Sequence, residues 1–173
     1  MYVLATLLFL IIVFLVSIEW TRLWGAPWAP TDMAVVHKML TMASVKPGEL
    51  VYDLGSGDGR ILITAARRFG ARAVGFEIDP LRYLWSQLRI QMLGLRSKVH
   101  VRYGNFFKYD LGKADVINCY LLQDTNNRLA EKLNSELSKE ARVVSSVYTF
   151  PSLSLIGKDR KLKISLYRGG RAS

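Results

Sequence analysis

A glycine-rich turn that directly follows a short apolar segment is the feature that most constrains the fold of this 173-residue chain. The segment covers Leu50–Leu54, and glycines then occupy alternate positions, at Gly55, Gly57 and Gly59. Glycine adopts positive φ angles and lets a ligand approach the backbone closely. The helix expected next offers free backbone N–H groups and the positive end of its dipole. A strand, a turn and a helix in this order predict a nucleotide-like ligand at the carboxyl edge of a parallel sheet.

Short apolar segments alternate with longer amphipathic segments along the chain. Strands are expected at Leu50–Leu54, Ala73–Glu77, Lys98–Tyr103, Val116–Leu121, Arg142–Tyr148 and Leu162–Tyr167. Helices are expected at about 32–44, 59–69, 80–94 and 124–138. This alternation predicts an α/β, Rossmann-like fold, in which helices cover both faces of a mostly parallel sheet. The tail after Pro151 shows no further strong helix, so we expect it to close the sheet with an antiparallel edge.

An apolar run without charged side chains covers residues 2–18. A membrane-spanning helix needs about 20 apolar residues, and Trp20 and Trp24 follow where indoles prefer the interface. The sequence therefore predicts one transmembrane anchor at 1–24, a linker at 25–31 and a domain at 32–173. A signal peptide, which would need basic residues before the run, and a soluble hydrophobic helix are the alternatives. All 24 Lys and Arg residues follow the run, which predicts a single-pass membrane protein with its domain on the cytoplasmic side.

The net charge of +10 belongs to the part of the chain after this run. Anionic lipid head groups, nucleic acid or an acidic protein partner would each account for it, and lipid is the simplest for a tethered domain. The single cysteine, Cys119, excludes an internal disulfide and a multi-cysteine zinc site. No metal site is predicted.

Charges around the glycine turn distinguish between nucleotide-like ligands. The dinucleotide fingerprint requires a glycine where Arg60 stands, and the phosphate-binding lysine motif is absent. Asp53 and Asp58 would repel a pyrophosphate, whereas they suit a ligand with a cationic amino group. S-adenosylmethionine has such a group, and we expect Asp53 to bond it directly or through water. The turn itself would add contacts at Gly55, Ser56 and Gly57.

Polar residues at the ends of the next two strands extend the predicted site. Glu77 follows the glycines at the distance, about 20 residues, where a carboxylate accepts both ribose hydroxyl groups. Asn105 follows the third strand, where it can bond an adenine edge while Ile78 and Phe106 stack on the faces of the ring. The alternative is a flavodoxin-like domain whose carboxylates are only surface charges.

With these features, the sequence resembles the class I (seven-strand) S-adenosylmethionine-dependent methyltransferases. More narrowly, it is similar to the short archaeal-type protein-lysine methyltransferases and their mitochondrial relatives that modify the ATP synthase c subunit. The resemblance covers about residues 30–151. It rests on Ala29–Thr31, Val51–Arg60, Ala73–Ile78, Gly104–Phe107, Tyr120–Leu122 and Arg142–Ser145.

This resemblance implies that 32–173 is a methyltransferase domain and that the glycine turn and Glu77 hold the cofactor. It also nominates Thr31, because the Pro-Thr element of the family folds over the cofactor. The family usually has proline after that threonine, where this chain has Asp32.

The end of the fourth strand faces the transferred methyl group in this fold. Tyr120 is there either the wall of an aromatic channel, which would lower the pKa of an acceptor lysine, or a packing residue. Enzymes that methylate exocyclic amino groups of bases usually carry Asn/Asp-Pro-Pro-Tyr/Phe here, and the segment Asn118–Leu121 has no proline. Nucleic acid is therefore not favoured.

The predicted activity is methyl transfer to lysine side chains of a protein substrate, and the anchor suggests that this substrate is itself a membrane protein. An RNA base methyltransferase and a non-catalytic, membrane-tethered protein that binds S-adenosylmethionine are the alternatives.

Overall fold

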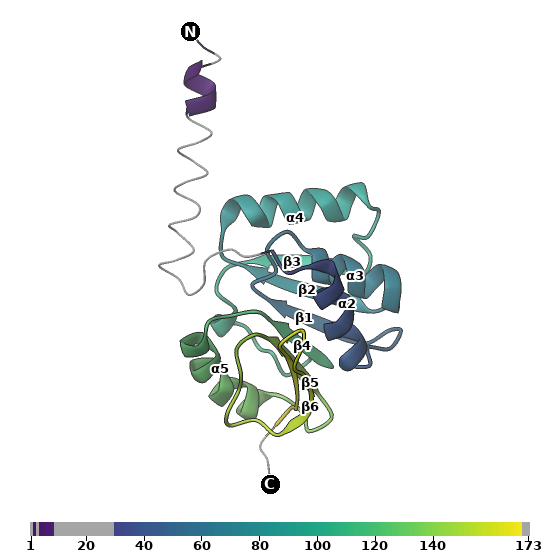
Figure 1. Cartoon of the computed structure of the whole chain (residues 1–173). Coiled ribbons are helices and arrows are strands. Elements are labelled where there is room, and N and C mark those ends of the chain that lie inside the picture. Colours follow the sequence, from purple (N-terminus) through teal and green to yellow (C-terminus); the bar gives the residue numbers. More distant parts are fainter. Residues whose placement is uncertain (1, 3, 9–29, 171–173) are drawn as a thin grey trace.

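A seven-stranded sheet forms the centre of the chain, which the computed structural model describes at residues 2, 4–8 and 30–170 (Figure 1). The strand order is β3-β2-β1-β4-β5-β7-β6. The five parallel strands are β1 (Leu50–Leu54), β2 (Arg72–Glu77), β3 (Val99–Tyr103), β4 (Val116–Cys119) and β5 (Arg142–Ser146). The antiparallel edge consists of β7 (Ile164–Arg168) and β6 (Leu155–Asp159). The predicted Rossmann-like sheet with an antiparallel edge is confirmed.

Helices cover both faces of this sheet (Figure 1). They are α2 (Met33–Met42), α3 (Arg60–Phe69), α4 (Pro80–Met92) and α5 (Gln123–Glu136), with a short 3₁₀ helix η1 (Phe106–Lys108). One core contains Val36, Leu62 and Ile90 of α2, α3 and α4, and the other contains Leu129 and Leu133 of α5. The central strands β1 and β4 are buried on both faces, which explains why their sequences are mostly apolar.

Local signals fix where these helices begin. The Asp32 carboxylate accepts the Ala34 N–H at 2.7 Å, and the Asp79 carboxylate accepts the Arg82 N–H at 2.9 Å. Both aspartates are therefore N-caps, of α2 and α4. At α3 this place is taken by Gly59, whose φ of 77° lies in the left-handed region.

Strands β4 and β5 both end two residues earlier than the sequence pattern predicts. Strand β4 ends at Cys119 because Leu122 is already the N-cap of α5. Strand β5 ends at Ser146 because Val147 leaves the extended conformation, with φ at 67°. As a consequence, Tyr120 and Tyr148 lie in loops beyond the carboxyl edge of the sheet.

The prediction of an N-terminal transmembrane helix is wrong, and so is the predicted single-pass membrane location, which depended on that helix. Across residues 2, 4–8 and 30–170, no helix is long and apolar enough to cross a bilayer. The rest of the apolar run, 9–18, and most of the predicted linker, 25–31, lie outside the described residues. The domain boundaries at 24 and 31 stay predictions.

Candidate cofactor site

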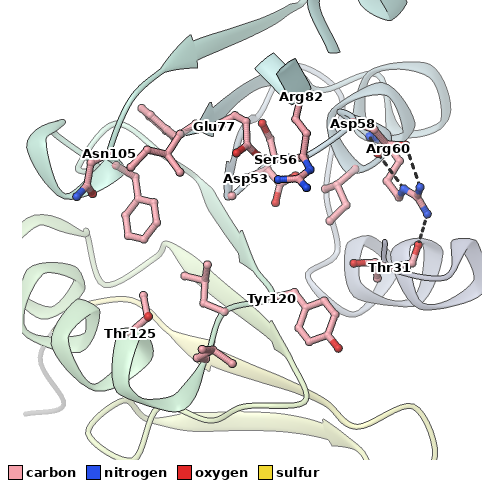
Figure 2. A pocket seen from close by; sticks show the side chains of 18 of the residues that line it. Thr31, Asp53, Ser56, Asp58, Arg60, Glu77, Arg82, Asn105, Tyr120 and Thr125 are labelled. Carbon is pink, nitrogen blue, oxygen red and sulfur yellow. Dashed lines mark hydrogen bonds and ion pairs between the residues drawn. The ribbon is translucent and has the colours of Figure 1, made fainter. Parts of the chain in front are cut away.

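A pocket of about 220 Å³ opens at the carboxyl edge of the parallel strands (Figure 2). All ten residues predicted to act line it, namely Thr31, Asp53, Gly55, Ser56, Gly57, Glu77, Ile78, Asn105, Phe106 and Tyr120. Figure 2 shows Asn105 at one side and Thr31 and Tyr120 at the other, with Asp53, Ser56 and Glu77 between them. The structure therefore brings together residues from four strand ends and from the segment before α2.

The glycine turn lies directly against the backbone of β2. Gly55 and Gly57 have φ angles of 84° and 54°, in the region that favours glycine. The N–H groups of Gly55 and Ser56 both donate to the backbone oxygen of Phe76, at 3.0 and 2.9 Å. A Cβ atom on Gly75 would lie 2.5 Å from the Ser56 hydroxyl oxygen. The close approach of turn and strand therefore requires glycine at position 75 as well.

Asp53 is a buried acid whose charge the protein compensates only weakly. The residue is 2 % exposed, and its carboxyl group accepts a hydrogen bond from the Asn118 side-chain amide at 3.2 Å. Burial, with a smaller contribution from the charges of Glu77 and Asp58, raises the pKa of Asp53 to about 8. A cationic ligand beside Asp53 would favour its ionised form, because an opposite charge lowers the pKa of a carboxyl group.

Glu77 is the better satisfied of the two buried acids. Its two carboxylate oxygens accept the N–H groups of Gly57 at 2.7 Å and of Asp79 at 2.8 Å. Burial still raises the pKa of Glu77 above its ordinary value. These two bonds fix the direction of the carboxylate, and each oxygen keeps a second lone pair for a ligand hydroxyl group.

Ser56 adds an unsatisfied polar atom to the same pocket. Its hydroxyl group is buried and has no hydrogen-bond partner within the part of the chain that the structure describes. Buried polar groups are normally hydrogen-bonded, so a free hydroxyl in a ligand pocket indicates a place for ligand atoms. The unsatisfied hydroxyl, the glycine cradle and the weakly compensated acid fit S-adenosylmethionine.

A chain of ionic contacts, which the sequence patterns did not predict, connects the turn to the segment before α2. The Asp58 carboxylate accepts two hydrogen bonds from the Arg60 guanidinium group, both at 2.9 Å, and pairs with Arg89 at 2.7 Å. Burial opposes ionisation of Asp58, but the two guanidinium groups outweigh it and lower its pKa. Arg60 also donates to the backbone oxygen of Thr31 at 2.7 Å, as the dashed lines in Figure 2 show.

These contacts change one inference from the sequence. Because Asp58 is already paired with two cations, the preference for a cationic ligand rests on Asp53 and Glu77. Nothing local in the sequence signals the bond between Arg60 and Thr31, which are 29 residues apart.

The side of the pocket around Asn105 suits a flat ring. Ile78 and Phe106 both line it and are partly buried. The Asn105 side-chain oxygen accepts the Phe107 N–H at 3.0 Å and so caps η1. This bond leaves the amide NH₂ group as the stronger candidate for contact with a ring nitrogen. Lining residues that were not predicted as site residues include Arg82, Phe107, Leu121, Leu122, Thr125 and Tyr148.

The other side of the pocket is aromatic and contains no nucleophile from β4. Tyr120 lines this side and is partly exposed. Cys119 is fully buried, and burial raises the pKa of its thiol to about 12. Such a thiol does not form the thiolate that covalent chemistry requires.

Comparisons with known proteins agree with this geometry. The family model described as the ANTKMT methyltransferase domain matches residues 53–156. A protein-lysine N-methyltransferase of Saccharolobus islandicus is 42 % identical over 120 residues, which are 69 % of this chain and 74 % of that protein. A lysine N-methyltransferase of Xenopus laevis that is named for the ATP synthase c subunit is 30 % identical over 126 residues, 73 % of this chain. The chain spans only about half of the length of that vertebrate relative, at 55 %.

One solved structure is similar to this chain, and the match covers nearly the whole length of that structure. It is an RNA methyltransferase from Salinibacter ruber in complex with S-adenosyl-L-homocysteine, with a TM-score of 0.78 and 36 % identity. The match covers 84 % of this chain and 95 % of that one. The predicted methyltransferase fold and the predicted cofactor, S-adenosylmethionine, are confirmed. The chain belongs to the family of S-adenosylmethionine-dependent methyltransferases that carries the ANTKMT methyltransferase domain.

Proposed function

We propose that this chain transfers the methyl group of S-adenosylmethionine to lysine side chains of a protein. The proposal rests chiefly on one observation: a pocket with two buried acids for the cofactor continues into an aromatic side at Tyr120. The names of the Saccharolobus and Xenopus relatives, both lysine methyltransferases, support the same acceptor.

Each residue of the pocket contacts a different part of the cofactor. The Asp53 carboxylate accepts hydrogen bonds from the α-ammonium group of the methionine part, and the Glu77 carboxylate accepts hydrogen bonds from the ribose hydroxyl groups. The turn contributes its backbone and one hydroxyl, at Gly55, Ser56 and Gly57. Ile78 and Phe106 stack on the adenine, whose edge Asn105 contacts. Thr31 covers the methionine end of the cofactor, and Arg60 fixes Thr31 there by donating a hydrogen bond to the Thr31 backbone oxygen.

When bound, S-adenosylmethionine supplies a methyl group that is activated by the positive charge on sulfur. The protein then has to align an acceptor amine with that methyl group and exclude water. Tyr120 provides an apolar ring at the aromatic side, which disfavours the charged form of an entering lysine and lowers its pKa. The neutral amine gains the methyl group and loses one proton to solvent.

RNA is the second candidate acceptor, because the similar Salinibacter structure is named an RNA methyltransferase and the net charge is +10. The position of Asn118 favours protein. In enzymes that methylate the amino groups of bases, a polar residue at this place bonds the flipped base. Here Asn118 is fully buried, bonds Asp53 at 3.2 Å and does not line the pocket.

Label transfer from S-adenosylmethionine tests the proposal. The full chain is incubated with labelled cofactor and a cell extract, and the products are divided between protease and RNase digestion. We expect label in protein that mass spectrometry locates on lysine Nε groups. A Glu77→Gln variant should lose the label, whereas Glu131→Gln, an exposed glutamate on α5, should keep it. Label that RNase alone removes would establish RNA as the acceptor, and binding without transfer would establish a non-catalytic protein.

A further inference from the structure

The loop after β5 contains a residue in a strained conformation. Val147 has a φ of 67° and is 43 % exposed, so tight packing of its side chain does not force this conformation. A β-branched residue at positive φ is costly because its Cβ atom approaches the backbone. Such strain persists only where the surrounding structure holds it, and it occurs preferentially at functional sites.

Bonds on both sides of Val147 hold this turn. The Val147 N–H donates to the backbone oxygen of Lys163 at 2.8 Å, and the Tyr148 N–H donates to that of Ser146 at 2.8 Å. The Ser145 hydroxyl donates to the backbone oxygen of Tyr148 at 2.6 Å. The backbone of Tyr148 is therefore fixed at both its N–H and its oxygen.

A side chain of α5 holds the next residue. The Gln123 amide donates to the backbone oxygen of Thr149 at 2.9 Å and accepts the Thr149 N–H at 3.1 Å. Phe150 then turns into the core, where it is 1 % exposed and contacts the ring of Tyr167. The packing of this loop is thus carried by Phe150, while Tyr148 belongs to neither hydrophobic core among the described residues.

The result of this arrangement is a tyrosine at the pocket. Tyr148 is partly exposed and lines the same pocket as Tyr120. The two follow β4 and β5, which are neighbouring parallel strands, so their loops leave the sheet at the same edge. The cofactor residues follow β1, β2 and β3, on the other side of β4.

We propose that Tyr148 is a specificity-determining residue that forms the acceptor site together with Tyr120. This inference rests on the proposed lysine acceptor. The two rings flank the methylene chain and the Nζ of the entering lysine, and their hydroxyl groups accept its N–H hydrogens. In the transfer, the Nζ lone pair forms the new N–C bond while the C–S bond breaks. Its electron pair stays on sulfur, which gives S-adenosylhomocysteine, and one amine proton passes to solvent.

Binding and kinetics of two variants, Tyr148→Phe and Tyr148→Ala, test the proposal in the full chain. The first probe is S-adenosylhomocysteine, titrated by calorimetry. The second is a synthetic peptide with the sequence around the most strongly labelled lysine of the transfer experiment, titrated into the protein with S-adenosylhomocysteine bound. The control is Tyr103→Phe, because Tyr103 is exposed and does not line the pocket.

For Tyr148→Ala we expect the Kd and KM of the peptide to rise about tenfold or more, with the Kd of S-adenosylhomocysteine within about twofold of wild type. Tyr148→Phe should keep most of the affinity and change the proportions of mono-, di- and trimethyllysine. Tyr103→Phe should match wild type.

Unchanged peptide binding by a folded Tyr148→Ala variant would overturn the proposal, and so would an equal loss of affinity for S-adenosylhomocysteine. Either result would leave the proposed lysine acceptor unaffected, provided that the wild-type chain labels lysine. A wild-type chain that labels no lysine would instead overturn the proposed function and this inference together.

Discussion

At the scale of single residues, the two buried acids of the pocket differ in how far the protein itself compensates their charge. Glu77 accepts two backbone N–H groups, whereas Asp53 has one amide contact at 3.2 Å. Hydrogen bonds to a carboxylate favour its ionised form, so Asp53 depends more strongly on a cation from outside. Binding of the cofactor should therefore be coupled to ionisation of Asp53.

The first prediction concerns the pH dependence of cofactor binding. Because the pKa of Asp53 is about 8 in the ligand-free chain, the carboxyl group is mostly protonated at neutral pH and has to release its proton to meet an ammonium group. Affinity for S-adenosylmethionine should rise as pH rises towards 8, by at most about tenfold per pH unit. Calorimetry in buffers of different ionisation enthalpy should detect the release of nearly one proton at neutral pH. An Asp53→Asn variant should bind weakly and without proton release, and an affinity of wild type that is independent of pH would contradict the coupling.

The second prediction concerns Arg60, a positioning residue that joins Asp58 to the backbone oxygen of Thr31. In Arg60→Gln the segment before α2 loses its link to the turn, so we expect faster dissociation of S-adenosylhomocysteine and a Kd raised about tenfold. Arg60→Lys should give only partial rescue, since an ammonium group lacks the planar fork that serves both partners. Stopped-flow measurement of the dissociation rate checks this. Arg67→Gln, which changes another arginine of α3, is the matched control, and equal rates in the two variants would exclude the role of Arg60.

At the scale of elements, the contact between the glycine turn and β2 limits what can stand in the strand. A Cβ atom on Gly75 would lie 2.5 Å both from the Ser56 hydroxyl and from a methyl carbon of Leu62 on α3. The φ angle of Gly75 is not positive, so glycine is required here because there is no room for a Cβ atom and not because of the backbone conformation. The position of the turn is therefore set by the strand beside it as well as by its own glycines.

The third prediction follows from this contact. Gly75→Ala should push the turn away from β2, lower the thermal stability and weaken binding of S-adenosylhomocysteine by more than about tenfold. Gly157→Ala is the matched control, because that glycine also lies in a strand and its added Cβ would meet only ordinary contacts, at 3.7 Å or more. Differential scanning fluorimetry with and without ligand gives both quantities. Equal effects of the two substitutions would show that the turn tolerates displacement.

The helices and strands also show which features can be predicted from the sequence and which cannot. Hydrophobic alternation predicts the four large helices and six of the seven strands, and it misses β6, whose side chains are mostly exposed. The spacing of Gly55, Glu77 and Asn105 places them at successive strand ends. The bond from Arg60 to Thr31 depends on how α3 and the segment before α2 pack, which no local pattern records. The sequence pattern extends the strand to Tyr148 because valine, at position 147, favours extended structure in most proteins. Contacts with Lys163 and Ser145 override that preference, and they appear only once the chain has folded.

At the scale of the whole molecule, the buried acids connect the site to the stability of the fold. The folded chain holds a proton on Asp53 up to about pH 8, whereas an unfolded chain releases it near the ordinary value of 3.8. Between these values the folded state binds more protons than the unfolded state, so the free energy of unfolding has to fall as pH rises. Glu77, whose pKa is also raised, acts in the same direction. A buried acid that serves the cofactor therefore lowers the free energy of unfolding of the ligand-free protein near neutral pH.

The fourth prediction is that urea unfolding of the ligand-free chain shows this loss between about pH 5 and pH 8, with a slope of at most about 1.4 kcal/mol per pH unit for each such proton. Asp53→Asn cannot ionise, so its slope should be smaller, and it should be the more stable protein at pH 8. Asp124→Asn, on the exposed first turn of α5, should keep the wild-type slope. Saturating S-adenosylmethionine supplies the missing cation and should stabilise wild type more at pH 8 than at pH 6. A wild-type slope equal to that of Asp53→Asn would mean that the carboxyl group is already ionised in the folded chain, and the proton release predicted for cofactor binding would then have no source.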